Sequence, residues 1–209
     1  MKKIFDDDEF QAELTSLFLS EGMSALSVGE IAARMRCSRR RLYELAGTKE
    51  ELFCRMIQRY FDNVLKNGNQ VIDQAQGNSA EVLTEYFRVG AKAGSTLSTA
   101  FLLDLERLPE AKKIFDEYQN ARAVVAEQLL EQGIREGFFV PCHVQLIVET
   151  LRAAAQRLRQ PEFLTKAGMT MDQAFDEFYR VMLGGLLEKR PGEPVKGKAP
   201  RTPKAKVPQ

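Results

Sequence analysis

Apolar residues recur every three or four positions along almost the whole chain, and this spacing restricts the fold more than any other feature of the sequence. Phe10, Leu14, Leu17 and Phe18 form one such stripe near the start. No segment shows the sustained two-residue alternation of apolar and polar residues that marks a half-buried strand. The sequence therefore predicts an all-α protein.

Composition excludes several classes of protein. The three cysteines are widely spaced without a CxxC pair, and His143 is the single histidine, so we expect no disulfide framework, no metal site and no cofactor. The chain turns acidic at residues 6–9, where a secretory signal would need an apolar core, and no segment approaches the length of a membrane span, so we expect a cytoplasmic protein without membrane association. Because the formal net charge is only +1, any argument for nucleic-acid binding must rest on local clusters of charge.

The first seventy residues contain the signals of four helices. Gly22 is placed to end the first helix, and Ser27-Val-Gly-Glu30 has the form of a capping box that opens a short second one. That helix breaks around Arg36-Cys37, where Ser38 can cap a third helix running to about residue 45. A second capping box, Thr48-Lys-Glu-Glu51, opens a long amphipathic helix. Two short helices thus flank a tight turn.

Four or more long helices are expected beyond Gly77. Pro109 suits the first turn of one of them, and Gly137 suits its C-terminal cap. Thr170-Met-Asp-Gln173 is a third capping box, which opens the last helix. The segment 190–209 is rich in Pro and Lys with almost nothing to bury, which predicts a disordered tail. This basic tail is either a linker, the interpretation we favour, or a source of sequence-independent attraction to DNA.

Positive charge is concentrated between residues 34 and 41. Five arginines lie within these eight residues, which contain no acidic side chain. If Ser38 is a cap, Arg39, Arg40 and Arg41 fill the first turn of the third helix, where each cation costs about 0.3–1 kcal/mol. Lys49 repeats this placement in the fourth helix. The pattern favours surfaces that bind an external anion such as phosphate, and the alternative is a solvated face.

On a helical wheel, Arg40, Tyr43 and Glu44 are the most exposed residues of the third helix, and Arg39 and Arg41 flank them. Arginine can bond guanine with two hydrogen bonds, and glutamate can accept from the amino group of cytosine. The hydroxyl of Tyr43 can donate to a phosphate, although a half-buried packing role is an equal alternative.

The segment from Leu26 to Phe53 resembles the DNA-binding signature of the TetR (tetracycline repressor) family of transcriptional regulators. The resemblance covers residues 10–55 and includes Glu30-Ile-Ala32, Leu42-Tyr43 and Lys49-Glu-Glu-Leu52. It implies an N-terminal three-helix, helix-turn-helix DNA-binding domain over residues 1–48, with the recognition helix at 38–45 in the major groove. The chain departs from the family at Leu45 and Ala46, where aromatic residues are common.

The resemblance also implies contacts with double-stranded operator DNA. Phosphate contacts would come from Ser27, Tyr43 and Lys49, and base contacts from the side chains of the third helix. The full set of candidate DNA-binding residues is Ser27, Arg36, Ser38, Arg39, Arg40, Arg41, Tyr43, Glu44 and Lys49.

Residues 49–189 resemble the family only in layout, which implies a C-terminal helical domain for effector binding and dimerisation. Candidate effector-binding residues, each of which can alternatively be plain core, are Phe87, Phe101, Leu105, Tyr118 and Arg122. Candidate residues of a homodimer interface on the last helix are Phe175, Phe178, Met182, Gly184 and Leu186. Gly184 and Gly185 would each cost about 1 kcal/mol within a helix, unless a close approach of helices across the interface offsets this. The alternative is a helix that ends at Gly184.

Taken together, these patterns and the resemblance to the TetR family imply a non-enzymatic, sequence-specific transcriptional regulator, most often a repressor in this family. A small apolar or amphipathic effector would modulate its operator binding. A helical-bundle enzyme is one alternative, but the sequence lacks a constellation of nucleophile, metal ligands or paired carboxylates. A helical protein-interaction adaptor without DNA binding is the other.

Overall fold

The computed structural model describes residues 7–186, and within that range the protein is all-helical, as predicted, with no β-strand. The predicted tail at 190–209 lies outside the described residues. The helices of the described part are α1 (Asp7–Glu21), α2 (Val28–Arg34), α3 (Arg39–Leu45), α4 (Lys49–Asp73), α5 (Ser79–Gly94), α6 (Thr99–Arg107), α7 (Pro109–Arg135), α8 (Val144–Leu158), α9 (Pro161–Ala167) and α10 (Met171–Leu186).

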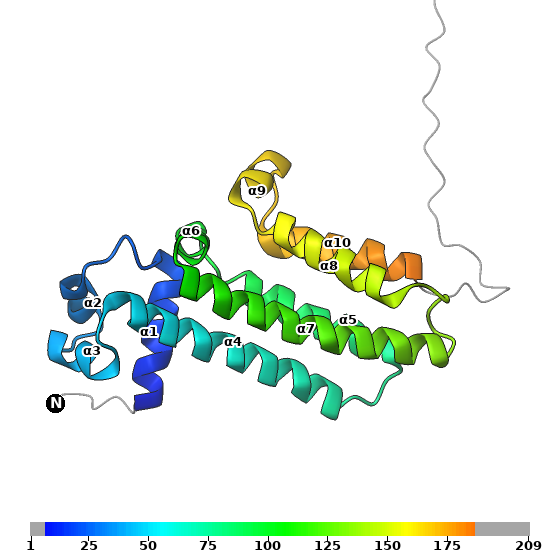
Figure 1. Ribbon diagram of the computed structural model, residues 1–209, viewed down its shortest axis with the longest axis horizontal. Helices are drawn as coiled ribbons and strands as arrows, with labels where there is room; N and C mark the ends of the chain where they lie inside the picture. Colours follow the sequence, from blue (N-terminus) through cyan, green and yellow to red (C-terminus); the bar gives the residue numbers. More distant parts are fainter. Residues whose placement is uncertain (1–6, 187–209) are drawn as a thin grey trace, which may run out of the picture.

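The first three helices gather at one end of an elongated molecule, and long helices extend from them (Figure 1). Helices α1, α2 and α3 form this end, and α4 continues from it along the length of the molecule beside α5 and α7. Helices α8 and α10 pack against each other, on α7 and α5 respectively, while the short α9 projects from them. None of the helices between residues 7 and 186 is long and apolar enough to cross a membrane.

The predicted caps explain where several helices begin. The Ser27–Glu30 capping box is present, with the Ser27 amide donating to the Glu30 carboxylate at 2.7 Å and the Glu30 amide donating to the Ser27 hydroxyl at 3.2 Å. Thr48 caps α4 as predicted, but the carboxylate of Glu51 accepts from the amide of Gly47 instead of from that of Thr48. The Thr170–Gln173 pair closes in both directions, at 3.0 and 3.5 Å.

Other features of the fold differ from the sequence prediction or complete it. Helix α6 is a separate nine-residue helix that the apolar pattern does not distinguish, and Ser98 caps it. An additional capping box, Asn78–Glu81, opens α5. Helix α10 runs through Gly184 and Gly185 to Leu186, so the alternative of a helix ending at Gly184 is wrong.

Three phenylalanines join the N-terminal helices to the rest of the protein. Phe53 of α4 lies between Phe18 of α1 and Phe101 of α6, with ring centroids 5.4 and 5.6 Å apart. All three are fully buried, as is Leu105 of α6. Aromatic pairs of this kind contribute about 0.5–1.5 kcal/mol beyond the burial of their area. The first three helices are therefore packed on a hydrophobic core that α4 and α6 complete.

A buried carboxylate reinforces this junction. Asp104 of α6 accepts hydrogen bonds from the amides of Met23 and Ser24 at 2.6 and 2.9 Å, and also from the Ser24 hydroxyl. Gly22 has φ +76°, and a Cβ there would lie 2.6 Å from an oxygen of Asp104. Glycine adopts this left-handed conformation without a steric penalty and leaves room for the carboxylate. The turn after α1 is thereby held on α6.

We expect Asp104→Ala to lower the free energy of unfolding by about 1–3 kcal/mol, because the substitution leaves two amides without their acceptor. Chemical denaturation followed by circular dichroism measures this. Asp116→Ala, which removes an exposed carboxylate of α7, is the matched control and should change stability little. Equal stability of the two variants would contradict the importance of the Asp104 hydrogen bonds.

Candidate nucleic-acid interface and effector cavity

The turn between α2 and α3 has an unusual backbone. Arg36 has φ +51°, and it is the one non-glycine residue with positive φ in the described part of the chain. The next amide, that of Cys37, donates back to the carbonyl of Ala32 at 2.9 Å, which completes the end of α2. A side chain in this conformation costs about 1–2 kcal/mol, yet an exposed arginine occupies the position.

The outer face of α3 carries the residues that the helical wheel predicts. The side chain of Arg40 is 89% exposed, and its Nε donates to Glu44 at 3.2 Å. Tyr43 is 52% exposed, so the alternative of a half-buried packing residue does not describe it. The inner face is anchored by the buried Leu42. An arginine, a tyrosine and a glutamate thus form an exposed face of the described structure.

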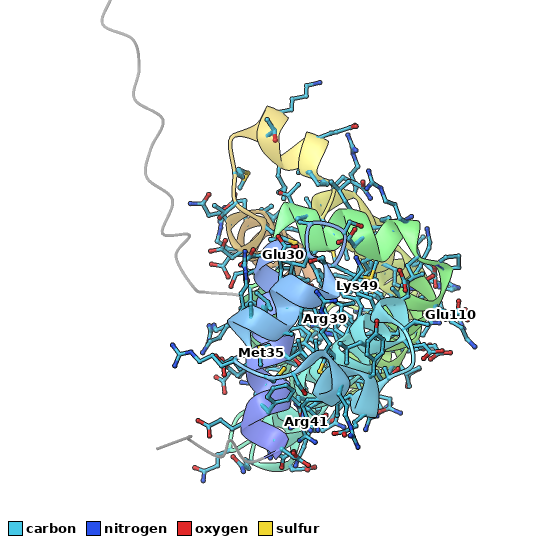
Figure 2. All side chains as sticks on the ribbon, turned by 90° about the vertical axis from the view of Figure 1, so that its left-hand side faces the viewer. Glu30, Met35, Arg39, Arg41, Lys49 and Glu110 are labelled. Atoms are coloured by element: carbon cyan, nitrogen blue, oxygen red, sulfur yellow. The ribbon has the colours of Figure 1, made fainter. Side chains whose placement is uncertain are left out.

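The flanking arginines are held by neighbouring elements. Arg41 forms an ion pair with Asp7 of α1 and a longer one with Glu44 at 3.6 Å. The guanidinium of Arg39 lies over α2, where a Cβ on Gly29 would come within 2.7 Å of it. Figure 2 looks onto this end of the molecule and labels both arginines. Arg39 and Arg41 therefore have intramolecular contacts beyond α3, whereas Arg40 contacts only its own helix in the described structure.

The two capping serines present their hydroxyls at the surface. The hydroxyl of Ser38 accepts from the amide of Arg41 at 3.2 Å, as that of Ser27 does from Glu30. Both residues are exposed, and a hydroxyl that accepts can still donate to a phosphate oxygen. The pKa of Glu30 is lowered by its hydrogen bonds with Ser27, so this carboxylate stays ionised.

Lys49 has structural partners that the sequence does not reveal. Its Nζ donates to the carbonyls of Met23 and Leu26, at 3.2 and 2.9 Å, in the loop between α1 and α2. The ammonium group has three N–H donors, so one is left for a phosphate. Lys49 therefore connects the start of α4 to this loop. The position of Lys49 in the first turn of the helix does not reveal this structural role.

Between residues 27 and 45, five arginines face two glutamates, Glu30 and Glu44. Outside this stretch, Glu21 pairs with Arg34, and Asp7 with Arg41. The excess of positive charge is local, because the net charge of the whole chain is +1. An exposed arginine-rich helix beside two helix N-termini is a surface suited to a polyanion.

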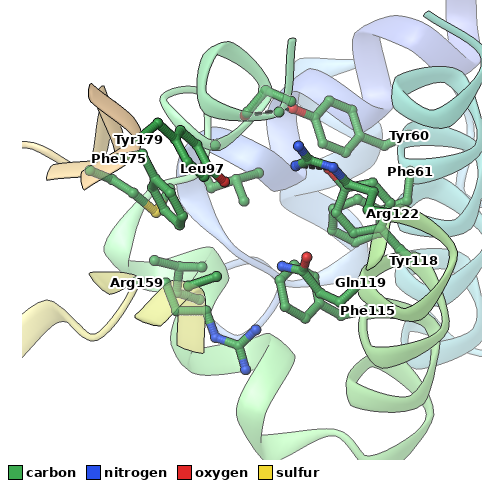
Figure 3. A pocket seen from close by; sticks show the side chains of 16 residues that line it. Tyr60, Phe61, Leu97, Phe115, Tyr118, Gln119, Arg122, Arg159, Phe175 and Tyr179 are labelled. Atoms are coloured by element: carbon green, nitrogen blue, oxygen red, sulfur yellow. Dashed lines mark hydrogen bonds between the residues drawn. The ribbon is translucent and has the colours of Figure 1, made fainter. Parts of the chain in front are cut away.

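A second feature lies in the larger helical body. A cavity of about 40 Å³ opens between α4, α5, α7 and α10, and we call it the aromatic cavity. Figure 3 shows its walls, which include Tyr60, Phe61, Phe115, Tyr118, Arg122 and Tyr179. Because about 10–15 Å³ is enough for one water molecule, the cavity holds only a few waters in this conformation.

The predicted effector residues are distributed over several places. Tyr118 and Arg122 line the aromatic cavity, and Phe87 lines a second cavity of about 40 Å³ that shares Arg122 and Tyr179 with the first. Phe101 and Leu105 do not reach the aromatic cavity, because both face the core between α1, α4 and α6. Sequence reasoning missed Tyr60, Phe61, Tyr179 and Arg159, whose helical spacing is the same as that of ordinary core residues.

The predicted interface residues of α10 differ from one another in how deeply they are buried. Phe175 is buried within the protein's own core, while Phe178 and Met182 are half-buried. Gly184 is exposed, and a Cβ at Gly184 or Gly185 would meet nothing within 4 Å in the described structure. Leu186 is the last residue of α10, and the position of its side chain lies outside the described part.

Comparison with solved structures decides the architecture. PfmR from Thermus thermophilus, a TetR-family transcriptional regulator, matches with a TM-score of 0.64 and 19% identity over 87% of this chain and 100% of that one. A TetR transcription regulator from Haloarcula marismortui matches with a TM-score of 0.69 and 14% identity, over 87% of this chain and 100% of that one. The chain has the TetR fold. KstR2 of Mycobacterium tuberculosis, a ketosteroid transcriptional regulator, matches with a TM-score of 0.60 and 20% identity, over 87% of this chain and 95% of that one.

No protein-family model matches the sequence, and neither does any curated protein. The assignment of the TetR fold therefore rests on structure, with identities of 11–20% among the solved relatives. It confirms the predicted all-α fold class, in which a small group of N-terminal helices joins a larger helical domain.

We expect Lys49→Met to lower the free energy of unfolding by about 1–2 kcal/mol, because two carbonyls of the α1–α2 loop lose a charged donor. The helix dipole alone predicts the opposite sign, since the substitution removes a cation from the positive end of α4. Chemical denaturation measures the difference. Lys113→Met, which removes an exposed lysine with one weak ion pair at 3.9 Å, serves as control. A stabilised Lys49 variant would mean that the hydrogen bonds contribute less than the dipole.

Proposed function

We propose that the protein is a sequence-specific DNA-binding transcriptional regulator, a repressor whose affinity for its operator is changed by a small apolar or amphipathic effector. The observation that carries this proposal is the outer face of α3. Arg40, Tyr43 and Glu44 are exposed together on a helix that capping and the buried Leu42 hold against the body of the protein. Residues of these types can read base edges in the major groove, and the cations around them can bind phosphates.

The coupling between effector and DNA would run through α6. Leu97 and Leu102, before and within this helix, line the aromatic cavity. Asp104, in the same helix, holds the turn after α1. A ligand that widens the cavity would move α6, and α1 with it. Such coupling need supply only about 1–3 kcal/mol to change operator affinity 5- to 150-fold.

A homodimer would present two recognition helices to a palindromic operator. We assign the interface to α8 and α10, because Val181 on α10 and Leu146 on α8 are 59% and 63% exposed. Val181, Gly184 and Gly185 lie on one face of α10, and the two glycines permit a close approach of a second helix. The protein would act in the cytoplasm, with access to chromosomal DNA, and without an enzymatic reaction.

The decisive experiment is selection of bound DNA from a random library, followed by affinity measurement on the selected site. We expect Arg40→Ala to lower specific affinity by about 1–3 kcal/mol and to relax discrimination at one position in each half-site, while non-specific binding changes less. Fluorescence anisotropy with selected and scrambled duplexes measures both effects.

Arg88→Ala is the matched control for this substitution. Arg88 is an exposed arginine that pairs with Glu85 on α5, outside the N-terminal helices. Its variant should bind all duplexes as the unaltered protein does. If selection yields no preferred sequence, or if Arg40→Ala binds the selected site normally, the arginine surface does not read DNA, and the adaptor function gains support.

We expect Val181→Arg to convert a dimer of twice the chain mass into a monomer, because two like charges would meet at the two-fold interface. Multi-angle light scattering measures the mass. Leu103→Arg changes an exposed apolar residue of α6 and should leave the dimer intact. A protein that is already monomeric at micromolar concentration, or a Val181 variant that stays dimeric, would remove the assignment of this interface.

A further inference from the structure

A positive charge without a matching negative one lies in the wall of the aromatic cavity. Arg122 of α7 is half-buried, and its guanidinium points into the cavity between Tyr60 and Tyr179 (Figure 3). Within residues 7–186, its guanidinium donates a hydrogen bond of 3.3 Å to the hydroxyl of Tyr118 and approaches the hydroxyls of Tyr86 and Tyr179, and no carboxylate forms an ion pair with it. A guanidinium has five N–H donors and remains charged at any physiological pH.

The second arginine of the same cavity has a carboxylate as its partner. Arg159 forms an ion pair with Glu106 at 2.8 Å, and its Cζ lies 4.3 Å from the centre of the Phe115 ring. Arg122 has tyrosines around it instead of a carboxylate, with its Cζ 5.3 Å from the centre of the Tyr86 ring and 5.8 Å from that of Tyr118. A partly desolvated cation without a counter-charge is costly, so the contrast between the two arginines marks Arg122 for an external partner.

The tyrosines around Arg122 do not supply the missing charge. Burial raises the pKa of Tyr86 and that of Tyr179, against a smaller opposing effect of Arg122, so both phenols are neutral at physiological pH. The hydroxyl of Tyr86 is buried and has no hydrogen-bond partner in the described structure. Neutral phenols stabilise the cation by their faces and can accept from its N–H groups, but they supply no negative charge.

The backbone of α5 is shaped to admit this guanidinium. A Cβ on Gly90 would lie 1.8 Å from an Nη atom of Arg122, so any side chain there would displace the arginine. Gly94, one turn further along the same helix, also lines the cavity, but a Cβ there would meet only the flexible end of Met171 at 3.3 Å. Glycine is disfavoured within a helix relative to alanine, and at position 90 it is what leaves space for Arg122.

We infer that the effector of this protein is an organic anion, a carboxylate on an apolar or aromatic body, and that Arg122 binds its charged group. This inference rests on the proposed function, because it names the chemical class of the ligand that the aromatic cavity takes. The planar guanidinium matches a carboxylate with two parallel hydrogen bonds. Arg122 and Tyr179 are shared by the two cavities, so an anion that draws Arg122 toward itself would join the cavities into one larger site.

The test titrates the full-length protein, without DNA, with three probes that share one body: 3-phenylpropionate, 3-phenylpropan-1-ol and 3-phenylpropylamine. Isothermal titration calorimetry measures the dissociation constants. We expect the carboxylate to bind about tenfold or more tightly than the alcohol, and the amine to bind most weakly, because a charge-assisted hydrogen bond is much stronger than a neutral one. An alcohol or amine that equals the carboxylate overturns the inference, and so does a carboxylate that shows no binding at millimolar concentration.

Two variants locate the charge. Arg122→Met and Gly90→Ala should both abolish the preference for the carboxylate, the first by removing the guanidinium and the second by displacing it. Arg88→Met, which removes an exposed arginine of α5 that lines neither cavity, is the control and should keep the preference. A Gly90 variant that keeps the preference overturns the assignment to Arg122 even if the Met variant fails to fold.

Melting temperatures without ligand separate binding from structure. We expect both variants to melt at or above the temperature of the unaltered protein, because an unpaired charge is removed or moved and alanine favours the helix. If both variants fail to bind all three probes and also melt at a markedly lower temperature, Arg122 is a structural residue and the inference is overturned. Failure of the proposed DNA-binding function would show in the selection experiment, which contains no probe.

Discussion

The carboxylate of Asp104 sets the position of the N-terminal helices on the rest of the protein. Two adjacent amides in the turn after α1 point at one carboxylate oxygen, and the left-handed Gly22 brings the backbone close enough for this contact. Ser98, at the start of α6, adds a backbone hydrogen bond of 2.9 Å to the carbonyl of Leu19. The end of α1 is therefore attached to α6, and the loop that leads to α2 and α3 starts from this contact.

Lys49 holds the same loop from the other side. It satisfies the carbonyls of Met23 and Leu26, while Asp104 satisfies the amides of Met23 and Ser24. The loop between α1 and α2 is thus fixed by one anion from α6 and one cation from α4. Because α4 and α6 also carry walls of the aromatic cavity, a change of shape there would reach both attachments at once.

The sequence predicted helix starts well because capping is local chemistry. Ser27, Ser38 and Thr170 each accept from an amide three residues away, so their roles depend on little else. The exposed face of α3 followed in the same way from helical geometry. The roles of Lys49 and Phe101 were harder to predict. The carbonyls that Lys49 binds lie 23 and 26 residues away along the chain, and the ring that Phe101 contacts lies on another helix. No local pattern distinguishes a cavity-lining tyrosine such as Tyr179 from an ordinary core residue, because both follow the same helical spacing.

The left-handed conformation of Arg36 sets stability against function at a single position. Glycine would relax the backbone there by about 1–2 kcal/mol, yet it would also remove an exposed cation from the turn that leads into α3. A library selected only for resistance to heat would therefore accumulate glycine at residue 36. If the arginine contributes to DNA binding, those same clones would be impaired regulators, so gains in thermostability at this turn would be a warning sign for anyone engineering the protein.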